Sequence, residues 1–226
     1  MIEEFTINNK LVKVFLPNSN ISKLPLIVLN TFEKEGDSVL DKCHNKNFIL
    51  VEITNIDWNN DLSPWYFPKL YKNDEDYLGN ADNFLHEIIF EIMPKVKKYL
   101  ESKNLSPSSY GIVGYSLAGL FSLYCAYKTN IFSYIGCISG SLWYPDIIEF
   151  VKNNKIQDNI KKIYFSLGNR ESLTKNNILS KVEENTKEIE KYIKSIGINT
   201  IYETNHGNHF KDVDIRTAKG IDWLLK

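Results

Sequence analysis

A serine set between an apolar run and a helical pattern carries the strongest chemical signal in the sequence. Ser116 is the third residue of Gly-Tyr-Ser-Leu-Ala-Gly at 114–119. In a nucleophile elbow the serine occupies a strained turn that lifts its hydroxyl clear of a sheet, and the residues two before and two after it must be small because strand and helix backbones nearly touch. Gly114 and Ala118 meet this requirement. The pattern predicts a nucleophilic Ser116, whereas in a plain glycine-rich turn the same serine would only cap a helix.

The base that would activate this serine is one of two histidines late in the chain. A serine hydroxyl needs a histidine to take its proton and a carboxylate to orient that histidine. His206 and His209 both follow the last predicted strand, in the loop before a C-terminal helical pattern. We favour His206 because it comes sooner after the strand and has the small Gly207 beside it, and His209 stays the alternative. In the other interpretation both are exposed loop residues.

The candidate for the carboxylate is Glu171. It is the first acidic residue after the apolar run 163–167, and a carboxyl group just beyond the end of a strand can reach an imidazole across the edge of the sheet. A solvated charge paired with Arg170 is the other interpretation. The charge that develops on an attacked carbonyl also needs two N–H donors. The backbone N–H of Leu117 would be one, and the loop after an earlier strand would supply the other.

Apolar runs alternate with helical patterns and indicate the elements that must position these residues. Compact apolar runs predict buried strands at 25–30, 47–53, 110–115, 132–139, 163–167 and 200–204. Helical periodicity predicts helices at 83–102, 117–128, 175–195 and 215–225, with a weaker one at 145–153. Alternating stretches at 3–7 and 11–16 predict an antiparallel hairpin. We therefore expect an α/β fold over residues 1–226, a single domain with a mostly parallel central sheet, an N-terminal antiparallel hairpin and helices on both faces.

The segment at about 57–82 stands apart because it is rich in aromatic residues and has no clear period. A connection of this length inside a compact domain is usually functional, and its aromatic content argues against disorder. We expect an insertion loop that contributes to an aromatic wall beside the serine, the alternative being ordinary burial under a long loop. The candidate substrate-binding residues are Trp65, Tyr66, Tyr115 and Trp143.

The composition argues against several classes of function. Of the 226 residues 43% are hydrophobic and 24% charged, and a formal net charge of −1 gives no field that would recommend nucleic acid or an anionic membrane as a partner. The acidic start of the sequence lacks the layout of a signal peptide, and no apolar run is long enough to span a bilayer. Three cysteines without C-x-x-C spacing fit a reducing cytoplasm and support neither a disulfide framework nor a zinc site. We expect a cytoplasmic location.

With these motifs in place, the chain resembles the putative-esterase group of the α/β hydrolases, which includes the enterochelin esterases and the S-formylglutathione hydrolases. The resemblance covers residues 25–225 and implies the α/β-hydrolase fold. In that group the first central strand ends in a Leu-Asp-Gly-Leu-like turn whose last residue donates an oxyanion N–H. The resemblance implies this role for Phe32, with Thr31 in place of the glycine. An aromatic residue four positions after the histidine is also typical of the group, and Phe210 fits that pattern for His206.

The resemblance implies a serine carboxylic-ester hydrolase that acts through an acyl-enzyme on a small or medium ester and requires no metal or cofactor. The same residues could serve an acyltransferase or a thioesterase, and a non-catalytic binding module on this scaffold is a further alternative. The expected partner is a small-molecule ester, with neither nucleic acid nor a membrane. No oligomeric state is predicted.

Overall fold

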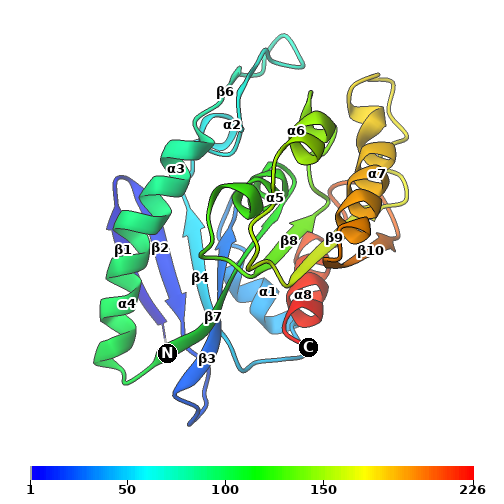
Figure 1. The fold of residues 1–226 in the computed structure, drawn as a ribbon. Coiled ribbons are helices and arrows are strands. Elements are labelled where there is room, and N and C mark those ends of the chain that lie inside the picture. The colour runs from blue at the N-terminus through cyan, green and yellow to red at the C-terminus, as the bar shows by residue number, and fades with distance from the viewer. Residues whose placement is uncertain (1) are drawn as a thin grey trace.

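A sheet of eight strands forms the centre of the molecule, in the order β1-β2-β4-β3-β7-β8-β9-β10 (Figure 1). The computed structural model describes residues 2–226. The strands are β1 (Ile2–Ile7), β2 (Lys10–Phe15), β3 (Lys23–Asn30), β4 (Ile49–Thr54), β7 (Ser106–Tyr115), β8 (Tyr134–Ile138), β9 (Lys162–Gly168) and β10 (Asn199–Asn205). The β1–β2 and β2–β4 pairs are antiparallel and the other pairs of this sheet are parallel. The predicted mostly parallel sheet with an antiparallel N-terminal hairpin is confirmed.

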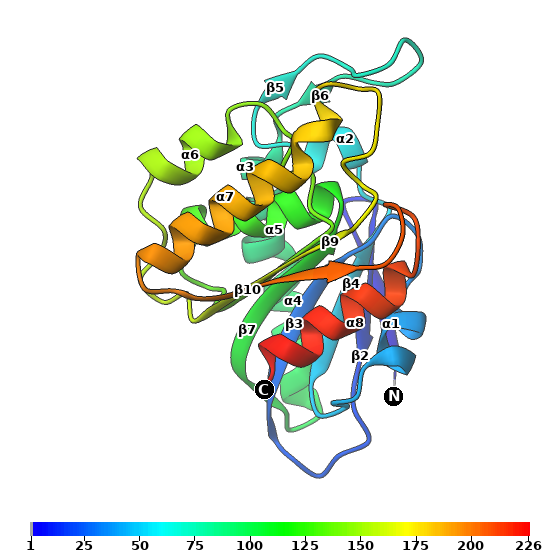
Figure 2. The same ribbon diagram turned by 90° about the vertical axis from the view of Figure 1, so that its right-hand side faces the viewer.

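Helices cover both faces of the sheet (Figure 2). On one face lie α1 (Gly36–Lys42) and α8 (Val213–Leu224), where Val39 and Ile221 share a buried cluster with Ile27 of β3. The helices of the other face are α3 (Ala81–Glu87), α4 (Met93–Ser102), α5 (Leu117–Lys128), α6 (Ile147–Asn153) and α7 (Val182–Ser195). No helix within residues 2–226 combines the length and the apolar character needed to cross a bilayer.

The central elements are buried on all sides, which explains why their sequences read as continuous apolar runs. All six residues of β4 are buried, as expected for a strand covered on both faces. In α5 every residue except Lys128 is buried. The strand β7 and the helix α5 therefore form the packed centre of the fold, and the turn between them is held from both sides.

The helix predicted at 83–102 is instead three consecutive segments. The π-helical turn η1 (Ile88–Ile92) separates α3 from α4, and Pro94 lies in the first turn of α4. A proline has no N–H, and its ring collides with the carbonyl four residues before it, so a regular α-helix is interrupted there. The wider turn keeps Ile92 and Val96 on the buried side. The apolar face thus continues across the interruption.

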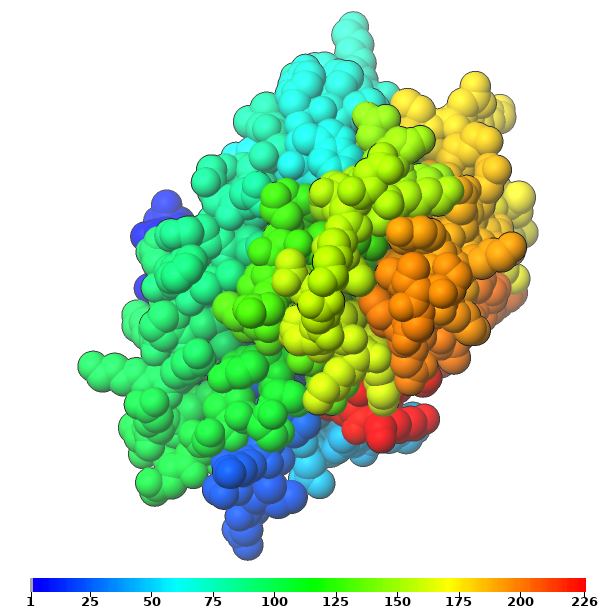
Figure 3. Space-filling view, in the orientation of Figure 1, coloured from blue at the N-terminus to red at the C-terminus, as the bar shows by residue number. Residues whose placement is uncertain are grey.

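The aromatic-rich segment at 57–82 contains short elements of its own and projects at the top of the molecule (Figure 3). These elements are α2 (Trp58–Asp61) and the antiparallel pair β5 (Tyr66–Phe67) and β6 (Tyr77–Leu78). An ion pair with 2.7 Å between Nζ of Lys10 and Oδ2 of Asp61 ties its base to β2. The indole N–H of Trp65 donates to the carbonyl of Pro145 at 3.2 Å. The segment is therefore anchored at both the hairpin and the loop before α6.

The carboxyl ends of the parallel strands lie along one edge of the sheet. Asn30 pairs with Gly114 near the ends of β3 and β7, and Gly168 pairs with Asn205 at the ends of β9 and β10. The loops that follow these strands therefore converge, and ligand sites of open parallel sheets form at such an edge.

Candidate active site

Ser116 lies at a strained turn between β7 and α5. Its backbone angles are φ 58° and ψ −122°, a conformation that residues with side chains rarely adopt. A Cβ atom added to Gly114 would lie 2.4 Å from the backbone carbonyl of Ala118. Strand and helix therefore meet where the sequence has its small residues, and this is the geometry of a nucleophile elbow.

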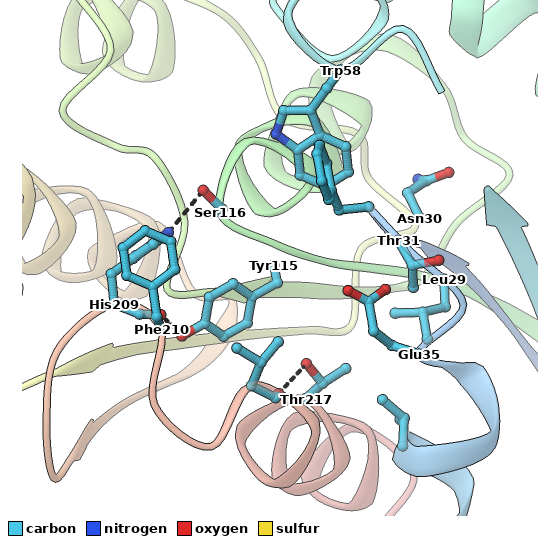
Figure 4. Close-up of a pocket in the computed structure, with 13 residues that line it drawn as sticks. Leu29, Asn30, Thr31, Glu35, Trp58, Tyr115, Ser116, His209, Phe210 and Thr217 are labelled. Carbon is cyan, nitrogen blue, oxygen red and sulfur yellow. Dashed lines mark hydrogen bonds between the residues drawn. The ribbon is translucent and has the colours of Figure 1, made fainter. Parts of the chain in front are cut away.

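The hydroxyl of Ser116 is hydrogen-bonded to His209, which is hydrogen-bonded to Glu171. Oγ of Ser116 lies 2.9 Å from Nε2 of His209 (Figure 4), and Nδ1 lies 2.7 Å from Oε2 of Glu171. An ionised carboxylate only accepts, so its bond to His209 requires the proton on Nδ1, which leaves Nε2 to accept from the serine hydroxyl. A hydroxyl, an imidazole and a carboxylate linked in this order can perform nucleophilic catalysis.

The sequence-based choice of His206 as the base is wrong in geometry, because the loop brings His209 to Ser116. The side chain of His206 is exposed. Gly207 has φ 106°, so the backbone turns sharply after His206 in a conformation that favours glycine. The N–H of Gly207 donates to Oδ1 of Asn169 at 2.9 Å, which fixes the turn. The residues after this turn cross the edge of the sheet, and His209 rather than His206 faces the serine.

Four donors surround the carboxyl group of Glu171, the residue that the sequence analysis named as the acid. Oε1 accepts from the N–H of Gly168 at 2.5 Å, the hydroxyl of Ser139 at 2.8 Å and the guanidinium of Arg216 at 3.1 Å. Oε2 accepts from His209. Burial alone would raise the pKa of Glu171, but the hydrogen bonds from His209 and the other donors hold this pKa below its ordinary value. Glu171 is therefore ionised at neutral pH and can stabilise a positive charge on the imidazole.

Arg216 of α8, which the sequence analysis did not single out, links the loops of the site. Its side chain is 1% exposed. Nη1 donates to Glu171 and, at 3.0 Å, to the hydroxyl of Tyr115. Nη2 donates to the backbone carbonyls of His206 and Asn208, each at 3.0 Å. One guanidinium therefore holds both the acid and the loop that carries the imidazole.

The two backbone groups predicted as an oxyanion hole lie beside the serine. Leu117 is the first residue of α5, so its N–H has no acceptor in a preceding helical turn. Phe32 follows the end of β3 and lines the same pocket as Ser116. The N–H of the neighbouring Thr31 donates to the carbonyl of Ile53 at 3.1 Å, which holds the turn before Phe32. The positions of both groups fit the predicted role.

Two pockets flank the hydrogen-bonded serine and histidine. The Phe32 pocket, of about 320 Å³, is lined by Leu29, Asn30, Thr31, Phe32, Glu35, Val39, Trp58, Tyr115, Ser116, His209, Phe210, Val213 and Thr217. The Trp143 pocket, of about 360 Å³, is lined by Ser116, Ser139, Ser141, Trp143, Arg170, Glu171, Leu173, Thr174, Leu179, Val182, Asn208, His209 and Phe210. Phe210 lines both pockets and is 85% exposed at their rim. Two pockets beside one hydroxyl can hold the two sides of an ester.

Of the four predicted substrate-binding side chains, two line these pockets and two do not. Tyr115 lines the Phe32 pocket, and Trp143 lines the pocket named after it. The prediction is wrong for Trp65, which packs against α6, and for Tyr66, which is 60% exposed and lines neither pocket. The insertion reaches the site through Trp58 instead. Its anchoring to the loop before α6 directs the other aromatic rings away from the serine.

Residues 2–226 hold no group of three His, Cys, Asp or Glu side chains arranged as ligands of a metal ion. The three cysteines are free and buried. Burial raises the pKa of the Cys43 thiol to about 12, so this thiol stays protonated and unreactive at neutral pH.

The order of the sheet, its helical cover and the strained serine turn after β7 define an α/β hydrolase. Comparison with known proteins narrows this class. The model of the family described as Putative esterase matches residues 30–211, and the chain belongs to this family of esterases. Among curated proteins it is 28% identical to the uncharacterized protein YbbA of Bacillus subtilis over 140 residues, which are 61% of this chain. The matched region spans 55% of the length of that relative.

Solved structures of hydrolases share the fold over nearly the whole chain. The siderophore hydrolase EstB from Aspergillus nidulans superposes with a TM-score of 0.81 at 17% identity, over 99% of this chain and 94% of its own. An IroE-like serine hydrolase from Shewanella oneidensis has a TM-score of 0.81 at 17% identity, over 100% of this chain and 79% of its own. The enterobactin esterase FES from Shigella flexneri has a TM-score of 0.72 at 17% identity, over 99% of this chain and 59% of its own. At such identities the likeness concerns the fold.

Proposed function

We propose that this protein is a serine esterase that hydrolyses a small or medium carboxylic ester through an acyl-enzyme. Membership of the esterase family supports ester hydrolysis. The observation that carries the serine mechanism is the continuous hydrogen-bonded path from Ser116 through His209 to Glu171, with distances of 2.9 and 2.7 Å. The elbow geometry, which strains Ser116 and exposes its hydroxyl to two pockets, supports the same role.

In the first half-reaction the ester is cleaved and its acyl group is transferred to the serine. Nε2 of His209 takes the proton of Ser116 as Oγ attacks the ester carbonyl carbon. The N–H groups of Leu117 and Phe32 bind the oxyanion that forms. The carbon–oxygen bond to the alcohol then breaks, and the leaving alkoxide takes the proton from His209. Glu171, ionised and held by its donors, stabilises the imidazolium throughout.

In the second half-reaction water releases the acid. His209 takes a proton from a water molecule, the resulting hydroxide attacks the acyl carbon, and Oγ of Ser116 leaves with the proton that the imidazole returns. The side chain of His209 is 29% exposed, and both pockets reach the surface around it. This access to solvent supports water as the acceptor, and transfer to a bound alcohol or thiol would use the same residues.

The test of the nucleophile uses a small ester that needs no particular pocket. Replacing Ser116→Ala removes the attacking oxygen and should lower kcat for p-nitrophenyl acetate by about 10⁴-fold or more. It should also abolish labelling by a fluorophosphonate probe. Turnover that survives this change at the wild-type rate, in protein with an unchanged circular dichroism spectrum, would refute the proposal.

A matched control replaces a second serine of the same site. Oγ of Ser141 lies 3.4 Å from Oγ of Ser116, yet no imidazole is bonded to it. The Ser141→Ala variant should therefore keep fluorophosphonate labelling at Ser116. Labelling lost in Ser141→Ala and retained in Ser116→Ala would reassign the nucleophile.

A further inference from the structure

One carboxyl group in the Phe32 pocket takes no part in the mechanism proposed above. Among the described residues that line this pocket, Glu35 is the only one with an acidic side chain. Figure 4 shows its carboxyl group between Tyr115 and Thr31, on the opposite side of Tyr115 from His209. The remainder of the lining is mainly apolar and aromatic. A carboxyl group in such surroundings is costly unless something binds it.

The carboxyl group of Glu35 is only partly satisfied by the protein. Its Oε2 is buried and has no hydrogen-bond partner within residues 2–226. Burial raises the pKa of Glu35, and the interactions with the backbone of Glu33 and the hydroxyl of Thr31 oppose this only in part. Although Glu35 is the residue before α1, its side chain makes no capping hydrogen bond to that helix. Neither helix capping nor an ion pair among the described residues explains why a carboxyl group lies here.

The nearby Glu52 shows what a structural carboxyl group looks like in the same loop. Its Oε1 accepts from the N–H of Gly36 at 2.6 Å and from the hydroxyl of Thr31 at 3.0 Å. The side chain is 1% exposed, and these bonds fix the turn that carries Phe32. Glu52 thus already supports the loop, and Glu35 is left with an unpaired oxygen beside a pocket.

The shape and lining of the pocket indicate what could reach that oxygen. Trp58 and Phe32 pack edge to face with ring centroids 5.2 Å apart, and Tyr115 forms a further aromatic wall. Such walls bind hydrocarbon well but offer few hydrogen bonds. A pocket of about 320 Å³ that starts at Ser116 therefore suits a short apolar chain with one polar group at its far end.

Resting on the serine esterase function proposed above, we propose that Glu35 binds a hydrogen-bond donor carried by the substrate. The substrate class is an ester with a hydroxyl or an ammonium group at the end of the apolar portion that enters the Phe32 pocket. A hydroxyl would donate its hydrogen to Oε2 of Glu35, and an ammonium group would do so with an added charge attraction. In either case the bound ligand supplies the partner that the protein leaves out.

The test compares matched esters in wild-type protein and in Glu35→Leu. One series carries a terminal hydroxyl, ammonium or methyl group in the acyl chain of p-nitrophenyl esters, and a second series carries these groups in the alcohol portion of butyrate esters. In one of the series the wild type should prefer the donor-bearing ester over the methyl-ended ester in kcat/KM by roughly 10- to 100-fold. Glu35→Leu should abolish this preference or reverse it.

Two further variants separate the possible donors and control for general damage. Glu35→Gln keeps a hydrogen-bond acceptor without the charge, so it should retain much of the preference for a hydroxyl and lose that for an ammonium group. If Glu35→Leu does not fold, Glu35→Gln tests the role of the carboxyl group by itself. Glu33→Gln changes an exposed carboxyl group two residues away, outside the Phe32 pocket, and should keep the wild-type ratio.

The outcomes distinguish this inference from the proposed function. A wild-type enzyme without preference for any donor-bearing ester, or a preference that Glu35→Leu and Glu35→Gln both leave unchanged, overturns the role of Glu35. Turnover of the same esters that persists in Ser116→Ala overturns the serine mechanism instead. A preference for the donor-bearing ester that is present in the wild type and falls only in the Glu35 variants supports the role of Glu35 together with the serine mechanism.

Discussion

Glu171 and Glu35 line different pockets beside Ser116, and the pKa values of their carboxyl groups are shifted in opposite directions. Burial penalises the charged form of both. In Glu171 the donors outweigh burial and the pKa is lowered, whereas in Glu35 they do not and the pKa is raised. The donors directed at each carboxyl group, acting against its burial, decide whether the pKa falls or rises.

The difference shows how one site can use the same residue type in two ways. Glu171 has its four donors before any substrate arrives, so it presents a fixed negative charge to His209. Glu35 has a buried oxygen without a partner among residues 2–226, and its side chain lines the Phe32 pocket. A preorganised charge serves catalysis, because it needs no rearrangement during the reaction, while an incompletely satisfied one serves selection.

The largest loss of activity is expected when the imidazole between Glu171 and Ser116 is removed. His209→Ala removes the group that bonds both Ser116 and Glu171, so kcat for p-nitrophenyl acetate should fall by about 10⁴-fold or more. The measurement is the initial rate of p-nitrophenolate release. His206→Ala is the matched control, and because the His206 side chain is exposed its rate should stay near that of the wild type. The reverse pattern would restore His206 as the base and contradict the geometry.

A smaller but broad effect is expected when one donor to Glu171 is removed. Arg216→Met breaks a buried pair and leaves two backbone carbonyls without their donor, so the free energy of unfolding should fall by about 3–5 kcal/mol. It should also lower kcat more than it changes KM. Urea unfolding monitored by tryptophan fluorescence gives the first quantity, and steady-state kinetics the second.

The pH profile distinguishes a positioning role of Arg216 from a purely structural one. Without the guanidinium the hydrogen-bonded pair of Glu171 and His209 loses a neighbouring positive charge and takes up a proton more readily, so the acidic limb of the kcat/KM profile should move to higher pH. Lys175→Met removes an exposed cation from the loop that carries Glu171, outside both pockets, and should leave both the profile and the stability near those of the wild type. A profile that is the same in Arg216→Met and in the wild type would mean that Arg216 only supports packing.

The smallest effect is expected in the pH dependence of the stability, and it tests whether the pKa values of Glu35 and Glu171 are shifted in opposite directions. Because the pKa of Glu35 is raised in the folded protein, its favourable contribution is complete below the ordinary pKa of 4.5 and is lost as the pH rises through the folded value. Glu35→Gln should therefore gain less stability than the wild type on acidification from pH 7 towards 4.5. For Glu171, whose pKa is lowered, the contribution runs the other way and is lost on acidification.

Thermal melts at a series of pH values measure the difference between the Glu35→Gln variant and the wild type. Using this difference cancels the titration of all other groups that the substitution does not touch. A difference in Tm that is constant from pH 7 to 4.5 would contradict the raised pKa of Glu35. Glu101→Gln, at an exposed position of α4, should give such a constant difference.

Most of the fold could be predicted because its signals are local. The run 110–115 has no charged residue, and the helix 117–128 has only one, at its last position. The small residues at 114 and 118 indicate the close contact of strand and helix within a few positions. The seven-residue α1 was not predicted, because so short an amphipathic segment has too few apolar positions to show a period. The π-helical turn at 88–92 was hidden by the unbroken apolar face around it.

The choice between the two histidines depended on the path of a loop, and that path is set by distant residues. Distance along the chain from the end of β10 favoured His206, but Asn169 and Arg216 fix the turn at Gly207 so that His209 reaches the serine. No pattern within residues 205–210 contains this information. The prediction that Trp65 and Tyr66 bind substrate was wrong for the same reason. The position of the insertion depends on contacts of Asp61 and Trp65 with residues that are distant in the sequence.

Arg216 and Glu35 could be found only in part from the sequence. Arg216 falls in the same helical stripe as the buried residues 220 and 224, so the periodicity of α8 held a weak signal for a buried cation. Glu35 lies among polar residues at the start of α1, where an acidic residue is ordinary. Only the surrounding pocket, which β3, α2 and α8 build together, makes its carboxyl group unusual.

The position of Arg216 on α8 has a consequence for how the enzyme matures. A growing polypeptide that has reached residue 210 already contains Ser116, Glu171 and His209, but it lacks the guanidinium that clasps the loops of the last two. The ribosome therefore adds Ser116 to the chain well before it adds Arg216. We expect ribosome-bound chains to hydrolyse no ester until α8 has left the ribosome and packed against the sheet.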